Sequence, residues 1–249
     1  MTRPTRLAFS TSLLLAALTA GCGGDIVLPD EGEAAHLLIF DGDEQIAQAG
    51  AALAEQVVVR VTDTRDRPVP NQEVSFAIGS GGGSVAPATV MTNADGQAAA
   101  GWTLGPNAGV QLLRVQTLRG GSTDNLEVSF RATAIAGSGS VLAGVSGDDQ
   151  TGPVNSALAD SLVVRATDAL GNPVANVEVT WSVTGGGSIS PLTVLTDDAG
   201  IAMAERVLGS TSGAQAAHAS VPGFTGSPVT FSHTAVPANP TVLVLVSGD

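Results

Sequence analysis

The chain repeats itself with a period of about 100 residues, and this repetition restricts its fold more than any other feature of the sequence. Residues 57–78 align without a gap onto residues 162–183, with ten of the 22 positions identical. The match continues from TVMTNADG at 89–96 to TVLTDDAG at 193–200. A chain that contains two copies of one unit of this length is expected to fold as two similar domains.

The start of the unit occurs three times. HLLIFDGDEQ at 36–45 corresponds to VLAGVSGDDQ at 141–150, and VLVLVSGD at 242–249 begins in the same way. We therefore predict two complete repeats and the first strand of a third. On this interpretation the sequence is either a fragment or a truncated product.

The apolar residues of each repeat alternate with polar ones, as in a β-strand with one buried face. In residues 57–61 the single charged residue, Arg60, is expected to point outward, which places the valines on either side of it in the core. The second copy gives the same result. The expected inward-facing residues are Val57, Val59 and Val61 in the first repeat and Leu162, Val164 and Ala166 in the second.

Turn residues separate these short strands. Arg67-Pro68 and Asn172-Pro173 lie between two strands of each repeat, and Asp95-Gly96 and Ala199-Gly200 precede later strands. No stretch has the period of a helix. About seven short strands per repeat predict an all-β fold of tandem immunoglobulin-like β-sandwiches.

The N-terminus has the pattern of an export signal. Arg3 and Arg6 precede an apolar segment at 7–20, which is shorter than the ~20 residues that a membrane-spanning helix needs. Residues 18–22, Leu-Thr-Ala-Gly-Cys, resemble the lipobox of bacterial lipoproteins, with Thr19 where leucine is usual. The resemblance implies cleavage before Cys22 and acylation of this residue. Several acyl chains would form a durable membrane anchor.

These patterns predict the following organisation. The signal peptide comprises residues 1–21 and a lipid-anchored linker residues 22–34. The two repeats occupy residues 35–135 and 140–236, and the strand of the third repeat occupies residues 237–249. By analogy with lipoproteins, Gly23 after the cysteine favours the outer membrane or the cell surface as the location.

Charge and cysteine content exclude several classes of protein. Without the signal, which contains two of the ten basic residues and no acidic residue, 228 residues have a formal charge of −15. Such a field repels phosphate backbones, so we expect no nucleic-acid partner. Cys22 is the only cysteine, so no disulfide can form within the chain, and packing alone must stabilise each repeat.

The segments 63–96 and 168–200 resemble the group 1 bacterial Ig-like repeats of the invasin/intimin family. Each segment contains Thr-Asp at a strand end, a Pro-Val turn and Asn-x-Glu-Val with an aromatic residue. A Gly-rich stretch and Thr-x-x-x-Gly-x-Ala follow. The resemblance covers about 200 residues and implies sandwiches that stack end to end into a rod on the bacterial surface. It does not imply a receptor site, because the barrel and the tip domain of the receptor-binding members have no counterpart here.

No residue pattern indicates catalysis or a cofactor. GSTSG at 209–213 has Thr211 where a nucleophile elbow requires serine, and is interpreted as a hairpin. GSGGGS at 79–84 cannot form a phosphate-binding P-loop because the chain has no lysine, and is interpreted as a mobile loop. The histidines, at non-equivalent positions without metal-ligand spacing, are His36, His218 and His233.

Acidic turns near the start of each repeat offer the single metal hypothesis. Asp41, Asp43, Asp148 and Asp149 could supply oxygen ligands for Ca²⁺, although their spacing fits no EF-hand loop. A solvated turn is the simpler interpretation.

The sequence therefore predicts a non-enzymatic, lipid-anchored spacer or adhesin stalk that contacts the membrane through Cys22. The alternative is a binding module for a glycan or a secreted protein. Trp102 and Phe224 are the remaining candidates for an exposed aromatic platform. Trp102 also aligns with Arg206 on a row that otherwise points inward, which we interpret as a strand end near the rim where arginine can reach solvent.

Overall fold

The computed structural model of the protein describes residues 32–120 and 123–238. The predicted signal peptide, Cys22 and the predicted strand of a third repeat (apart from residues 237–238) lie outside these residues. The described part is all-β and has 18 strands. It has no helix that is long and apolar enough to cross a membrane.

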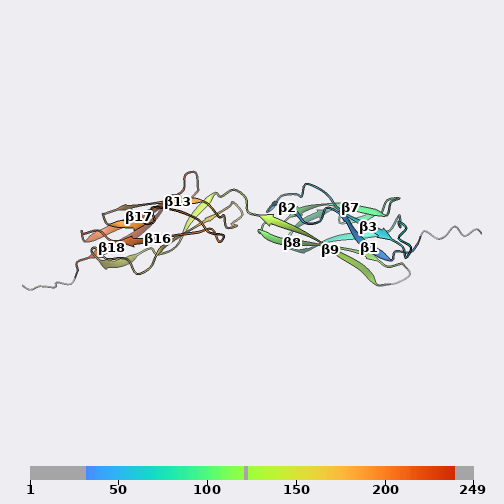
Figure 1. Cartoon of the computed structure of the whole chain (residues 1–249), viewed down its shortest axis with the longest axis horizontal. Coiled ribbons are helices and arrows are strands. Elements are labelled where there is room, and N and C mark those ends of the chain that lie inside the picture. Colours follow the sequence, from blue (N-terminus) through green and yellow to red (C-terminus); the bar gives the residue numbers. More distant parts are fainter. Residues whose placement is uncertain (1–31, 121–122, 239–249) are drawn as a thin grey trace, which may run out of the picture. The chain divides into compact units, whose positions relative to one another are not determined.

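The first repeat is a sandwich of two sheets (Figure 1). One sheet has the order β1-β3-β7-β5 and the other the order β2-β9-β8-β4-β6. The strands are β1 (His36–Asp41), β2 (Gln45–Gln48), β3 (Val57–Thr62), β4 (Glu73–Ser80), β5 (Gly83–Ala86), β6 (Thr89–Met91), β7 (Gln97–Leu104), β8 (Gly109–Leu118) and β9 (Asn125–Ile135).

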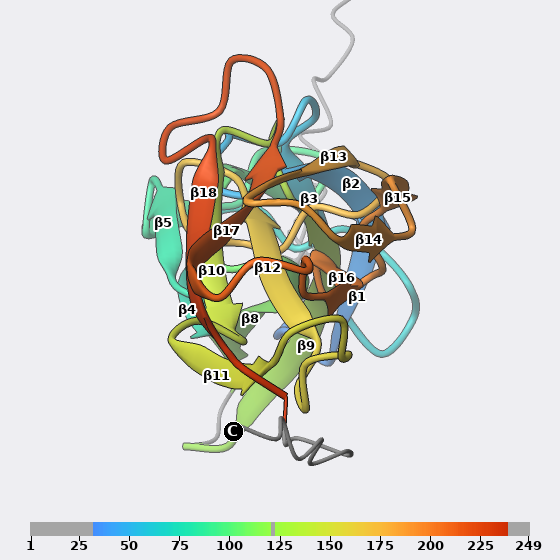
Figure 2. The same cartoon turned by 90° about the vertical axis from the view of Figure 1, so that its left-hand side faces the viewer.

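The second repeat has the same topology, with sheets β10-β12-β16-β14 and β11-β18-β17-β13-β15. Figure 2 shows β12 beside β16 and β17 beside β18, in agreement with their antiparallel pairing. The strands are β10 (Val141–Ser146), β11 (Gln150–Pro153), β12 (Leu162–Thr167), β13 (Glu178–Thr184), β14 (Ser188–Ser190), β15 (Thr193–Leu195), β16 (Ile201–Val207), β17 (Gly213–Ser220) and β18 (Val229–Val236).

The predicted fold class, tandem Ig-like sandwiches, is confirmed. Each repeat has nine strands rather than about seven, because the initial strand is divided between the two sheets and short strands border the Gly-rich segments. The stretch at 79–84 is not a free loop. It contains the end of β4 and the start of β5, joined by a tight turn in which Gly81 and Gly82 have positive φ.

The second part of the divided initial strand, β2 or β11, runs in the same direction as the last strand of its repeat. β2 pairs with β9 in parallel, with Gln45 opposite Ala132, and β11 pairs with β18 in parallel, with Gln150 opposite His233. Because parallel neighbours start at the same end of a sheet, the chain enters a repeat at one pole and leaves it at the other. This property belongs to each repeat separately.

Each repeat encloses its own hydrophobic core. The predicted orientation of the alternating residues is confirmed: the three valines of β3 are fully buried, and so are the three corresponding residues of β12. Arg60 is half-buried and donates from Nε to the carbonyl oxygen of Asp95. The aromatic residues Phe76 and Trp181, at equivalent positions of β4 and β13, also face the cores.

A glycine before β7 and its counterpart before β16 allow a close backbone contact in each core. The amide of Val61 donates to the carbonyl of Gly96 at 2.8 Å, and Gly96 has a φ of +71°. A Cβ at this position would lie 2.5 Å from the carbonyl oxygen of Val61. Gly200 is in the same situation against Ala166. The repeated Gly in the turn is therefore required by the close approach of two backbones.

The interpretation of Arg206 as a rim residue is wrong. Arg206 is 1% exposed, as is its counterpart Trp102. The alternation of β7 and of β16 places these side chains between the sheets of their own repeats, and the guanidinium finds its hydrogen-bond acceptors there instead of reaching solvent.

Candidate functional surfaces and the buried polar cluster

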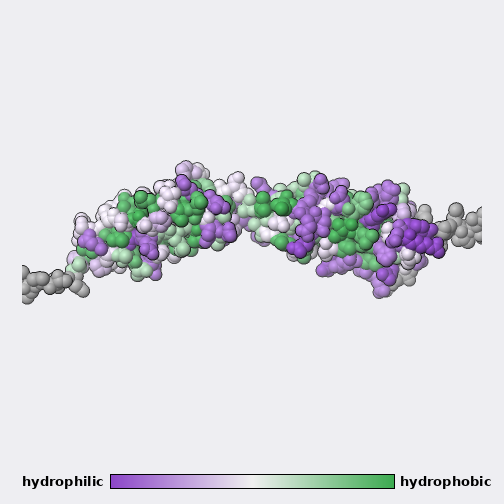
Figure 3. Space-filling view, in the orientation of Figure 1, coloured by the Kyte–Doolittle hydropathy of each residue, from purple (hydrophilic) through white to green (hydrophobic). Residues whose placement is uncertain are grey.

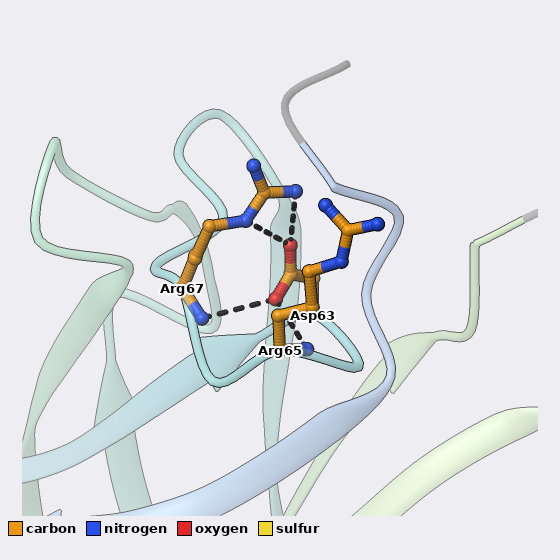
Figure 4. A network of polar contacts seen from close by, with 3 residues as sticks. All are labelled: Asp63, Arg65 and Arg67. Carbon is orange, nitrogen blue, oxygen red and sulfur yellow. Dashed lines mark hydrogen bonds and ion pairs between the residues drawn. The ribbon is translucent and has the colours of Figure 1, made fainter. Parts of the chain in front are cut away.

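A buried aspartate organises the turn that follows β3 in the first repeat and β12 in the second. In the first repeat, Oδ1 of Asp63 accepts hydrogen bonds from the amides of Arg65 and Arg67, at 2.8 and 3.0 Å. Its Oδ2 accepts from Nε of Arg67 at 2.7 Å and forms an ion pair with the same guanidinium (Figure 4). The carboxylate thus acts as the hydrogen-bond acceptor for two backbone amides of the turn.

Asp168 has the same position in the second repeat with different partners. Its Oδ1 accepts from the amides of Leu170 and Asn172 at 2.9 and 2.8 Å. Its Oδ2 accepts from the amide of Gly137 at 2.9 Å and from Nδ2 of Asn172 at 3.0 Å. The segment that leads into the second repeat is therefore attached to this carboxylate.

Hydrogen bonding makes both aspartates stronger acids. Burial alone would raise the pKa of Asp63, but the two amides and Arg67 outweigh it and lower the pKa below 3.8. Burial also opposes the shift at Asp168, where Asn172 and the amides of Gly137 and Leu170 lower the pKa. In both cases the folded state favours the charged carboxylate. The resulting stabilisation of the folded state is present above pH 3.8 and is lost as the pH falls through the lowered pKa.

We expect Asp168→Asn to lower the free energy of unfolding of the second repeat by about 1–3 kcal/mol at pH 7, because an amide nitrogen then faces amide donors. Urea denaturation at pH 7 and pH 3 measures the effect, and the gap between variant and parent should narrow at pH 3. Asp198→Asn, at an exposed position of a later turn, is the matched control. Equal midpoints for the two variants would contradict this role of Asp168.

The acidic turns of the calcium hypothesis are engaged in hydrogen bonds within their own repeats. Asp43 accepts from the amide of Arg131, and Asp148 accepts from the amide of Ser232, so each holds the last strand of its repeat. Asp41 accepts from the neighbouring amide of Gly42. Among residues 32–120 and 123–238, no group of three His, Cys, Asp or Glu side chains could hold a metal ion. Calcium binding by Asp41, Asp43, Asp148 and Asp149 stays a prediction.

The second repeat contains a buried polar cluster between its sheets, formed by Arg206, Gln215 and His233. Arg206 donates to the carbonyls of Gly186 and Ser188, at 2.7 and 3.2 Å, and to that of Val207. It also donates from Nη2 to Oε1 of Gln215 at 3.1 Å. Gln215 and His233 are direct partners across β17 and β18.

The glutamine of this cluster is present in both repeats. Oε1 of Gln111 accepts from the amide of Gly105 at 2.8 Å, and its Nε2 donates to the carbonyl of Asn107 at 2.9 Å. Gln215 makes the corresponding bonds to Gly209 and Thr211, at 2.8 Å each. The interpretation of GSTSG at 209–213 as a hairpin is wrong. The segment is a turn organised by the buried side chain of Gln215, and it connects β16 of one sheet to β17 of the facing sheet.

Arg206 and His233 have no polar counterparts in the first repeat, where Trp102 and Ala132 occupy their positions. His233 is 3% exposed, and neither ring nitrogen has a hydrogen-bond partner within the described residues. The sequence pattern singles out the position of Arg206 but does not predict the cluster. The signal for it was the change of Trp to Arg and of Ala to His on two inward-facing rows.

The candidates for a carbohydrate platform do not form one. Trp102 is buried in the first core, and Phe224 is half-buried and packs against the second core. Of the other histidines, His36 is exposed on β1, and His218 is half-buried and bonds through Nδ1 to the hydroxyl of Thr230.

The edge strand β1 exposes three consecutive large apolar residues of the first repeat. Leu38, Ile39 and Phe40 are 50%, 38% and 53% exposed. Figure 3 shows an apolar patch in the region where Figure 1 labels β1 and β9. The equivalent residues of β10 include Ala143 and Gly144, so the patch is a property of the first repeat and not of the fold.

Residues 143–234 match the family described as bacterial Ig-like domain (group 1). The second repeat is a bacterial Ig-like domain of group 1. The first repeat has the same order of strands in both sheets and the same buried aspartate and glutamine, so the chain contains two Ig-like domains in tandem.

Several solved structures of bacterial surface proteins resemble this pair of Ig-like domains. The D0-D1 domain of intimin is 22% identical with a TM-score of 0.31, and the match covers 81% of this chain and 96% of that one. InvD of Yersinia pseudotuberculosis is 20% identical with a TM-score of 0.49, covering 81% and 58%. The Escherichia coli adhesin FdeC is 19% identical with a TM-score of 0.41, covering 82% and 66%. No curated protein matches the sequence.

Proposed function

We propose that this chain is a lipid-anchored, non-catalytic protein of the bacterial envelope whose group 1 Ig-like domains act as a spacer or adhesin stalk. The observation that supports this most is the parallel pairing of the first and last strands in both repeats. A domain that receives the chain at one pole and releases it at the other adds its length to a string of such domains.

The way in which the repeats are stabilised agrees with this role. Each has a separate core without a disulfide, with three buried aromatic residues in the first repeat and two in the second. Domains that carry their own cores can be joined in series because none depends on its neighbour for burial of apolar surface. The negative charge suits an exported protein, and its sign argues against adhesion to anionic lipid through the repeats.

The proposed anchor is Cys22, ten residues before the first described residue. A thioether-linked diacylglycerol together with an amide-linked acyl chain supplies more than the single chain that gives only marginal membrane binding. Position 23 is glycine, which on the lipoprotein analogy directs the protein to the outer membrane.

Expression of the full chain in a Gram-negative host with labelled palmitate tests the anchor. We expect the label on the parent protein and in the membrane fraction, and its complete loss in Cys22→Ser. Gly23→Asp should keep the label but move the protein to inner-membrane fractions. A parent protein without label would refute the anchor.

Exposure on the cell surface is tested separately by adding protease to intact cells. Cleavage of the repeats in intact cells would place them on the cell surface. Protection from the protease in intact cells would place them in the periplasm. Saturable binding of a glycan or a secreted protein by the purified repeats would instead support a binding module.

A further inference from the structure

The buried cluster of the second repeat places two basic side chains together without an acidic partner inside the core. Arg206 comes from the sheet that contains β16, and His233 comes from β18 of the facing sheet. Gln215 on β17 links them, because it accepts a hydrogen bond from Arg206 and lies directly opposite His233. Nε of Arg206 and both ring nitrogens of His233 lack partners among the described residues.

The fold itself does not require this arrangement. In the first repeat the same sites hold Trp102, Gln111 and Ala132, all of them buried, and the sheets have the same order. Trp102 stands where the second repeat has Arg206, and Ala132 stands where it has His233. The first repeat therefore serves as an internal reference without a titratable group at this place.

The surroundings of His233 disfavour a second positive charge. From β16 it faces Arg206, from β17 the neutral Gln215, and from the turn between β10 and β11 the carboxylates of Asp148 and Asp149. Its neighbours on β18 are Ser232 and Thr234, which are neutral. Asp148 is already engaged by the amides of Ser232 and Asp149.

Burial is the main reason why the pKa of His233 is lowered from 6.5, and Arg206 adds to the effect, while Asp148, the backbone of Ser232 and Asp149 oppose it in part. The folded repeat thus keeps the imidazole neutral, whereas an unfolded chain protonates it near pH 6.5. Since the unfolded state binds more protons at His233 below this pH, the contribution of His233 to the stability of the second repeat falls as the pH falls below 6.5.

We propose that the second repeat is a pH-sensitive element of the chain, in which protonation of His233 beside Arg206 weakens the packing of β17 and β18 against the facing sheet. The first repeat does not respond. β18 is the strand through which the chain leaves the second repeat, and it is held by β17 on one side and by β11 on the other. Mild acidification therefore loosens the strand through which the chain leaves the second repeat, while the first repeat stays folded.

The two tryptophans make this proposal testable in the full chain, because each repeat has one and the chain has no tyrosine. In Trp102→Phe, Trp181 alone reports on the second repeat. In Trp181→Phe, Trp102 alone reports on the first. We expect the melting temperature reported by Trp181 to fall by roughly 5–10 °C between pH 7.5 and pH 5.0. That reported by Trp102 should change by much less.

Two variants of His233, made in the Trp102→Phe background, assign the effect. His233→Ala introduces the residue of the first repeat, and His233→Gln keeps a polar side chain that does not titrate. Both should remove most of the fall in melting temperature, whereas His218→Ala should retain it. An equal fall in the His233 variants, or no fall in the parent, would overturn the proposal.

Discussion

Phe231→Ala is expected to lower the free energy of unfolding of the second repeat by about 3–5 kcal/mol, since a buried aromatic ring is lost and a cavity remains. Phe231 is 2% exposed and belongs to the second core. Its ring is 5.9 Å from that of Trp181, at an angle of 33°. The β-sheets on both sides are held by ladders of hydrogen bonds and cannot collapse far into the space.

Urea denaturation in the Trp102→Phe background measures this effect through Trp181. The same substitution in the Trp181→Phe background is the control, because Trp102 then reports on a repeat that retains its own Phe130. Its unfolding midpoint should not move. A large shift of both midpoints would show that the two cores unfold as one unit, in contradiction to their description as separate clusters.

Gln215→Leu is expected to destabilise its repeat more than Gln111→Leu destabilises the other. Leucine has a similar volume, but it leaves the buried amide of Gly105 or Gly209 without an acceptor, which costs about 1–3 kcal/mol. In the second repeat, Arg206 loses a partner as well, and a hydrogen bond to a charged group contributes a further 1.5–3 kcal/mol or so.

Gln215→Leu is measured in the Trp102→Phe background and Gln111→Leu in the Trp181→Phe background. The unfolding free energy of each variant is compared with that of its own parent. The difference between the two losses isolates what the buried guanidinium adds, because the bonds between the glutamine and the turn that joins the two sheets are the same in both repeats. Equal losses would mean that Arg206 is satisfied by the carbonyls of Gly186, Ser188 and Val207 alone.

The repetition and the alternation of residues were sufficient to predict the architecture. A period of about 100 residues identified two equivalent units, and the single Arg60 within a run of valines gave the orientation of β3. These predictions depend on local rules: successive side chains of a strand point to opposite faces, and apolar ones are buried. The glycine at position 96 was recognised as a turn residue, although the carbonyl that excludes a side chain there comes from a different strand.

Only the tertiary structure decided where Arg206 points and what surrounds His233. The alternation of the strand that contains Arg206 predicts a buried side chain, whereas the charge of Arg206 predicts a position at the rim of the sheet. The burial of a guanidinium depends on acceptors, and those of Arg206 come from the Gly-rich turn before β14 and from β17. A single sequence shows which residues alternate along one strand, but not which carbonyls of distant segments converge on a side chain. The position of each strand therefore follows from the residues of that strand. Whether a charged side chain can be buried in the core depends on hydrogen-bond acceptors from distant segments, which only the fold brings together.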